Sequence, residues 1–233
     1  MTSMNPPSSI QHAVATVVAS PAPVLAVDAC GILDIVRSQY RFEAPNRLLE
    51  TALGALGASA GQPTQLHLVV FSQVNDEVQR NLEAEQRRLK EHTLTLRNTG
   101  CAVLSRTEVG AWNRAIQSIE DTLSSFPQTW IDSSHLVSPD PTCMSRAQVR
   151  LASNIAPAKR GSNNIGDCLI VEHLLEMGRL LKADAFMQPF LFVSSNAKDF
   201  GRAVLKTPLD TEFQSAGIDY LPHIEAAMMQ LGF

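Results

Sequence analysis

Four carboxylates in this chain lie at positions that a folded sheet would bring close together. Asp28 directly follows the apolar segment VLAV, and Asp199 lies four residues after the segment PFLFVSS. Glu77 comes early in the charged segment that follows a third apolar segment, TQLHLVVF. Asp167 belongs to the amphipathic segment 161–181, and at 100° per residue it falls on the apolar side of that helix. A carboxylate that only faces solvent would lie on the opposite side of the helix. The position of Asp167 on the apolar side therefore indicates a role inside the fold.

These positions predict one joint site. In open α/β sheets, sites form outside the carboxyl ends of the strands, where Asp28, Glu77 and Asp199 are expected. Carboxylates brought this close repel one another unless a cation neutralises them. Mg²⁺ or Mn²⁺, which prefer oxygen ligands and bind substrate phosphates, is the cofactor that the cluster predicts. Two such ions roughly 4 Å apart activate a water and stabilise the leaving oxygen in phosphodiester cleavage.

Each acid also has a simpler structural interpretation. Asp28 and Asp199 could cap the helices that follow them, and Glu77 could be a first-turn acid favoured by the helix dipole. Asp167 is the hardest to explain in this way. Glu172 and Glu176, on the polar side of the same helix, are expected to be solvated.

Short apolar segments alternate with helical patterns along the chain, which predicts an α/β fold with a mainly parallel sheet. We expect strands at 24–27, 64–71 and 189–195. We expect helices after residue 31 and at 45–58, 75–98, 109–123, about 144–152, 161–181 and near the C-terminus. The segment 126–141, rich in Pro, Ser and Asp, is expected to be a loop. Residues 1–20 are expected to form a flexible tail.

The composition fits a single well-packed domain, expected over residues 21–233. The chain has 233 residues, 45% of them hydrophobic and 18% charged, and a formal net charge of −4. This charge argues against a generally basic nucleic-acid binder but is compatible with a local basic groove. Four cysteines without a C-x-x-C pair predict reduced thiols in a cytoplasmic protein. No apolar run reaches the roughly 18 residues of a membrane span, so no membrane partner is expected.

Four segments carry a resemblance to a known family: VLAVDACGIL, VNDEV, NNIGDCLIVEHL and LFVSSNAKDF, in this order along residues 22–202. They resemble the strand-end Asp, the helix-borne Glu, the Asn-x-x-Asp helix start and the Thr/Ser-x-Asp/Asn strand end of PIN-domain nucleases. The resemblance implies a three-layer α/β/α Rossmann-like fold and Mg²⁺- or Mn²⁺-dependent endonucleolytic cleavage of single-stranded RNA. Many members are toxins of bacterial toxin–antitoxin modules. The extra length, a helical insertion at about residues 85–155, favours a larger subgroup, so a protein inhibitor of antitoxin type is not assumed.

Carried over residue by residue, the resemblance makes Asp28, Glu77 and Asp167 ligands of the metal. Cys30 departs from the pattern, because many members have Ser or Asn two residues after the first Asp. This departure weakens one expected polar contact.

The last motif leaves two alternatives open for the fourth ligand. Ser194 stands at the Thr/Ser position and is counted among the catalytic residues. Asn196 stands where many members have the fourth Asp, and Asp199 lies three residues further on. Either residue would complete the centre; we favour Asp199 as the charged ligand and Asn196 as the group that orients water or phosphate.

A nucleic-acid backbone also needs cations beside the metal centre, mostly as phosphate contacts. Lys159 and Arg160 directly precede the Asp167 helix, and Lys198 flanks Asp199. Together with Asn164 and the free amide groups of the helix start, they form the predicted phosphate-binding wall.

Two other functions stay open. A phosphatase of the haloacid-dehalogenase type would use Asp28 as nucleophile, but Cys30 stands where that pattern has a second Asp. A non-catalytic PIN-like module would bind RNA or a protein partner, and Cys30 and Asn196 are the features that favour it. The terminal segment AAMMQLGF packs either on the core or on a second subunit, so a homodimer also remains open.

Overall fold

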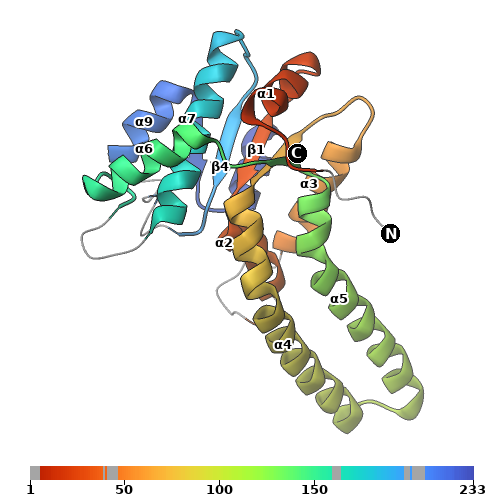
Figure 1. Ribbon diagram of the computed structural model, residues 1–233. Helices are drawn as coiled ribbons and strands as arrows, with labels where there is room; N and C mark the ends of the chain where they lie inside the picture. Colours follow the sequence, from red (N-terminus) through yellow and green to blue (C-terminus); the bar gives the residue numbers. More distant parts are fainter. Residues whose placement is uncertain (1–5, 39, 41–46, 159–163, 197–199, 201–207) are drawn as a thin grey trace.

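Five short strands form one parallel sheet at the centre of the molecule (Figure 1). The structure is a computed structural model, and it describes residues 6–38, 40, 47–158, 164–196, 200 and 208–233. Within these residues the strand order is β3-β2-β1-β4-β5, and each neighbouring pair is parallel. The strands are β1 (Val24–Val27), β2 (His67–Phe71), β3 (His135–Val137), β4 (Phe190–Val193) and β5 (Ile218–Leu221). The predicted α/β fold with a mainly parallel sheet is confirmed.

Helices cover both faces of this sheet, which produces three layers. One layer holds α1 (Ile10–Ala19), α7 (Ile165–Ala183) and α9 (Pro208–Ala216), with α6 (Pro141–Ala152) packed on α7. The other holds α2 (Ala29–Arg37), α3 (Leu48–Ala60), α4 (Ser72–Val103), α5 (Arg106–Asp132) and α10 (Ile224–Leu231). Right-handed crossovers require this division, because the chain steps from β1 to β3 in one direction across the sheet and from β3 to β5 in the other.

The central strands are apolar except for His67 at the start of β2, because both of their faces are covered. Every residue of β1, β2 and β4 is buried, as the continuous apolar runs of these segments predict for a parallel sheet. In the parallel register Val27 pairs with Val193. The chain therefore leaves β1 and β4 at neighbouring points of the same sheet edge.

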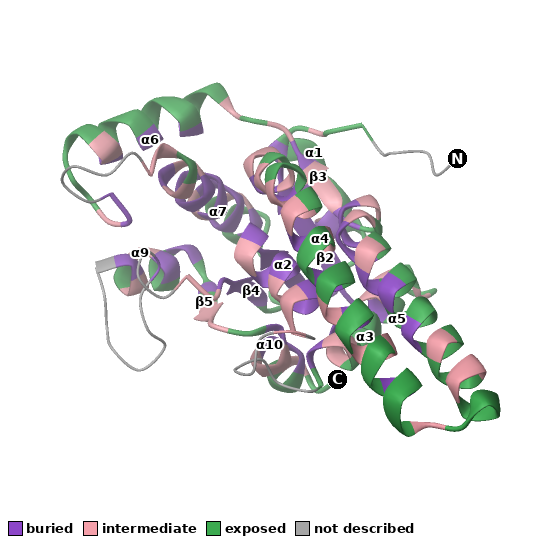
Figure 2. Cartoon of the chain, turned by 90° about the horizontal axis from the view of Figure 1, so that it is seen from below, coloured by how far each residue is buried: buried purple, intermediate pink, exposed green. Residues whose placement is uncertain are grey.

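Helices α4 and α5 form a long antiparallel hairpin that projects beyond the sheet (Figure 1). Its far half is largely exposed, whereas the strands and α7 are mostly buried (Figure 2). Buried polar contacts join the two helices: Glu120 accepts from Thr93 at 2.8 Å and from Arg97 at 2.9 Å. The predicted helices 75–98 and 109–123 are present and longer than expected. Among the described residues, no helix, α4 included, is long and apolar enough to cross a membrane.

The expected loop at 126–141 is wrong over most of its length. Helix α5 continues through Pro127 to residue 132, and residues 135–137 form β3. Phe126 and Trp130 stand one helical turn apart and are both buried, and their burial outweighs the helix-breaking tendency of proline. Because β3 belongs to the central sheet, the segment 85–155 is not wholly an insertion.

The expected flexible tail is wrong from residue 10 onward. Helix α1 begins after Ser9, whose side chain accepts a hydrogen bond from the amide of His12. Its buried residues are Ile10, Ala13, Val14 and Val17, the i, i+3, i+4, i+7 spacing of an amphipathic helix. The sequence interpretation also missed the fifth strand, β5, and the helix α9 before it.

Gly178 allows α9 to pack closely on α7, and we expect its replacement to destabilise the fold. A Cβ atom there would lie 2.5 Å from the carbonyl oxygen of Ala216. This oxygen belongs to the backbone, which cannot move aside as easily as a flexible side chain. We expect Gly178→Ala to lower the free energy of unfolding by about 1–3 kcal/mol. Gly54→Ala is the control, because a Cβ atom at this exposed helical position meets nothing within 4 Å. Gly54→Ala should raise the free energy of unfolding by at most about 1 kcal/mol. Urea unfolding measures both, and equal values would contradict the argument.

Candidate functional site

Asp28 lies at the carboxyl end of the central strand β1 and is held by three hydrogen-bond donors. It is the N-cap of α2, and its Oδ1 accepts from the amide of Ala29 at 2.7 Å. Its Oδ2 accepts from the hydroxyl of Ser194 at 2.8 Å and from the thiol of Cys30 at 3.1 Å. Only 2% of Asp28 is exposed. Burial raises the pKa of this carboxyl, although the three donors act in the opposite direction.

The turn after β4 reaches Asp28 through Ser194. This serine is fully buried, so it does not face the solvent as a catalytic group would. Its Oγ donates to Asp28 and accepts from the backbone amide of Asn196 at 3.1 Å. Ser194 therefore positions the first acid and the turn that carries Asn196.

A cleft of about 880 Å³ lies where α4, the start of α7 and the turn after β4 meet. Four of the predicted site residues line it together: Glu77, Asn164, Asp167 and Asn196. They are far apart in the sequence, and the fold brings them to one surface. Asp167 is half-buried in the first turn of α7, on the side that faces the cleft.

The charge of Asp28 reaches the cleft at Glu77. Burial, and after it the negative charge of Asp28, raise the pKa of the Glu77 carboxyl, while Arg80 and Arg37 act to lower it. Asp28 itself is not among the described residues that line the cleft. Its role as a direct ligand therefore stays a prediction, while its charge acts on the lining residue Glu77.

The described carboxylates provide few ligands for a divalent cation. Among the described residues, no three His, Cys, Asp or Glu side chains lie close enough to hold one ion. The expected four-carboxylate cluster includes Asp199, which lies outside these residues, so it stays a prediction. Mg²⁺, however, keeps several waters and is typically bound through one or two carboxylates and the substrate's phosphates. Glu77 and Asp167, both oxygen donors on one cleft, are suited to that lower demand.

Four predicted site residues lie outside the described residues: Lys159, Arg160, Lys198 and Asp199. The choice between Asn196 and Asp199 as the last ligand therefore stays a prediction. Asn196 does line the cleft.

Cys30 makes the polar contact to Asp28 that was expected to be weakened. Its thiol takes the place of a hydroxyl as donor to Asp28. Burial, and then the charges of Asp28, Glu77 and Asp34, raise the pKa of this thiol. Cys30 therefore remains a protonated donor among carboxylates.

Sequence reasoning missed a cation in the cleft. Arg80 lines the cleft and is exposed. It lies three residues after Glu77, so the two side chains share one face of α4. The spacing of Glu77 and Arg80 is visible in the sequence, but the predicted phosphate contacts all lie in segments next to Asp167 or Asp199.

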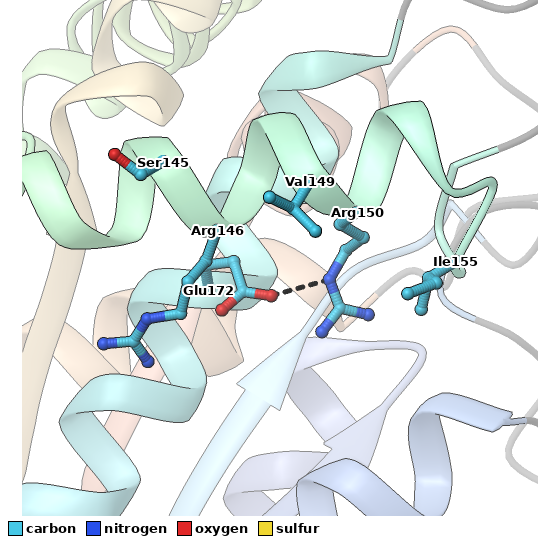
Figure 3. A pocket seen from close by; sticks show the side chains of 6 residues that line it. All are labelled: Ser145, Arg146, Val149, Arg150, Ile155 and Glu172. Atoms are coloured by element: carbon cyan, nitrogen blue, oxygen red, sulfur yellow. Dashed lines mark hydrogen bonds and ion pairs between the residues drawn. The ribbon is translucent and has the colours of Figure 1, made fainter.

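A second cavity, of about 310 Å³, lies between α6 and α7 (Figure 3). The charged residues that line it are paired: Arg150 with Glu172 at 2.7 Å, and Arg146 with Glu176, which lies outside the lining, at 2.9 Å. The expectation that both glutamates are solvated is wrong, because α6 covers the polar side of α7. These ion pairs join α6 to α7, and every charged side chain among the described lining residues takes part in one.

The geometry does not suit a phosphatase that uses Asp28 as nucleophile. Both oxygens of this carboxylate accept hydrogen bonds, and the side chain is buried. An attacking oxygen needs access to its substrate, which the described surroundings of Asp28 do not offer.

The chain was compared with family models, curated proteins and solved structures, and none of these matches it.

We expect the charge of Asp28 to control the ionisation of Glu77. Asp28→Asn removes the negative charge and should lower the pKa of the Glu77 carboxyl, because one of the two causes of its rise disappears. Side-chain ¹³C NMR titration measures the shift. Asp219→Asn, at an exposed position on β5, is the control and should leave Glu77 unchanged. An unaltered pKa in Asp28→Asn would show that the two acids are not coupled.

Proposed function

We propose that this protein is a divalent-metal-dependent endoribonuclease of the PIN type, which hydrolyses phosphodiester bonds in single-stranded RNA. The observation that carries the proposal is the meeting of Glu77 and Asp167, 90 positions apart, on one cleft beside the buried charge of Asp28. Such carboxylates bind hard divalent cations, and these cations bind phosphates. The choice of RNA follows from the family resemblance.

Glu77 and Asp167 are the residues that would hold Mg²⁺ or Mn²⁺. The ion would neutralise charge at the phosphate and lower the pKa of a water, so that hydroxide is available for the attack. The negative charge of Asp28 nearby favours the binding of a cation in the cleft. Burial, and after it the charge of Asp28, raise the pKa of Glu77, and a bound cation would favour the ionised form of both carboxyls.

The other lining residues suit the substrate. The guanidinium of Arg80 provides a positive charge for a phosphate, with donors arranged for bidentate contact. Asn164, whose side-chain amide donates to the carbonyl of Pro157, and Asn196 also line the cleft. Lys159, Arg160 and Lys198 remain proposed contacts for the flanking phosphates.

Cleavage of labelled single-stranded RNA in the presence of Mn²⁺ tests the activity. We expect Asp167→Asn to reduce the rate on the order of 100-fold, the usual effect of losing one preorganised electrostatic contact. Chelation with EDTA should abolish cleavage. Asp184→Asn, at the exposed far end of the same helix, should retain the wild-type rate.

Three results would contradict the proposal in different ways. Equal cleavage by wild type and Asp167→Asn would exclude the site. RNA binding without cleavage by the wild type would favour the non-catalytic module. Hydrolysis of a small phosphomonoester that depends on Asp28 would favour the phosphatase.

Arg80 should bind the RNA backbone. We expect Arg80→Ala to weaken binding of a fluorescent single-stranded RNA several-fold and to reduce the slope of log K against log salt by about 0.7, the value of one phosphate contact. Fluorescence anisotropy in EDTA measures both without cleavage. Arg87→Ala is the control, since Arg87 is exposed on the same helix but does not line the cleft. Identical slopes for the two variants would exclude Arg80 as a phosphate contact.

A further inference from the structure

A network of charged side chains joins three of the elements that meet near the cleft. Glu85 lies two turns beyond Glu77 on α4 and is buried. Its Oε1 accepts from Nη2 and Nε of Arg37 on α2, at 2.8 and 3.1 Å. Tyr40 donates to its other oxygen. The helix that begins at Asp28 and the helix that carries Glu77 are therefore clamped to each other by one guanidinium.

Both charges of the clamp are largely shielded from solvent. Burial by itself would raise the pKa of Glu85, but hydrogen bonds from Arg37 and Tyr40 overcome this and lower it to about 2. The carboxylate thus stays ionised at all physiological pH values. Breaking such a pair leaves an uncompensated buried charge, which is costly.

Asp34 extends the clamp to the turn after β4. Its Oδ1 accepts from Nη1 of Arg37 at 3.2 Å, and its Oδ2 accepts from the hydroxyl of Ser195 at 2.5 Å. Ser195 stands between Ser194, which holds the Asp28 carboxylate, and Asn196, which lines the cleft. One carboxylate on α2 therefore binds both the clamp and the middle of this turn.

We propose that Asp34, acting through Ser195, is a positioning residue that fixes the turn 194–196 and thereby sets Asn196 and the Asp28 carboxylate relative to the cleft. Asp34 does not line the cleft among the described residues and takes no part in bond making. As far as it concerns a reaction, this inference rests on the proposed function. Its structural part, the tethering of the turn, is independent of it.

The effect on the reaction follows from the distances involved. A catalytic group displaced by about 1 Å loses on the order of 100-fold in rate. Without the Ser195–Asp34 bond, the middle of the turn loses its link to α2, while the hydrogen bonds of Ser194 and the bond from the amide of Phe200 to the carbonyl of Asn196 remain. The turnover number should therefore fall while substrate binding through Arg80 is preserved.

The test uses Ser195→Ala, which removes the tether alone, and Asp34→Ala, which removes the tether and the Asp34–Arg37 contact but keeps the Arg37–Glu85 clamp. Ser195→Thr retains a hydroxyl and should rescue. Ser125→Ala is the matched control, because this exposed hydroxyl donates only to carbonyls of its own helix. The first measurement is the ¹H–¹⁵N resonance of Asn196, whose amide donates to Ser194. The second is kcat and KM for RNA cleavage.

We expect the Asn196 resonance to move in Asp34→Ala, which changes no sequence neighbour of Asn196, but not in the Ser125→Ala control. We expect kcat to fall roughly 10- to 100-fold in Ser195→Ala and Asp34→Ala with KM changed little, and to recover in Ser195→Thr. An unmoved resonance in Asp34→Ala would overturn the positioning role, whether or not the protein cleaves RNA. A moved resonance with unchanged kcat would overturn its importance for the reaction. A moved resonance in a protein that cleaves no RNA would support the tether and contradict the proposed function instead.

Discussion

The burial of one carboxylate, Asp28, at the end of the central strand is the constraint on which the arrangement of this site depends. An ionisable group in an apolar sheet edge is stable only with hydrogen-bond partners. Here the partners come from both flanks: the first turn of α2 provides two donors, and the turn after β4 provides the hydroxyl of Ser194. Satisfying this carboxylate therefore holds the ends of two neighbouring strands together.

Helix α4 links this strand-end site to the projecting hairpin. Its first turns present Glu77 and Arg80 to the cleft, and two turns further on Glu85 enters the clamp with Arg37. Beyond that point the helix leaves the sheet and pairs with α5 through Glu120. One rigid helix thus carries cleft residues, the buried clamp and the base of the hairpin. Their spacing is set by helical geometry, 1.5 Å per residue.

The charges of α7 show why residue type alone did not separate site from scaffold. Asp167, Glu172 and Glu176 are all acids on one helix. The first lines the cleft, whereas the other two are covered by α6 and neutralised by its arginines. Periodicity identified the odd position of Asp167 because it lies on the apolar side. It could not show that the opposite side is also buried, since a second helical layer leaves no signal in the period of the first helix.

The sequence alone determined the α/β class and the three central strands, because buried parallel strands are short continuous apolar runs. It also predicted that Asp28, Glu77, Asp167 and Asp199 would meet, because parallel strands deliver their carboxyl ends to one edge. Of these, Glu77 and Asp167 line one cleft, and Asp199 lies outside the described residues. Only the tertiary structure decided the rest. β3 and the end of α5 form in a segment rich in residues typical of loops, because Phe126 and Trp130 are buried in the core. The burial of Asp28, the clamp around Glu85 and the tether from Asp34 to Ser195 depend on contacts between residues 48 to 166 positions apart. No local pattern specifies such contacts, since each exists only once the layers have closed.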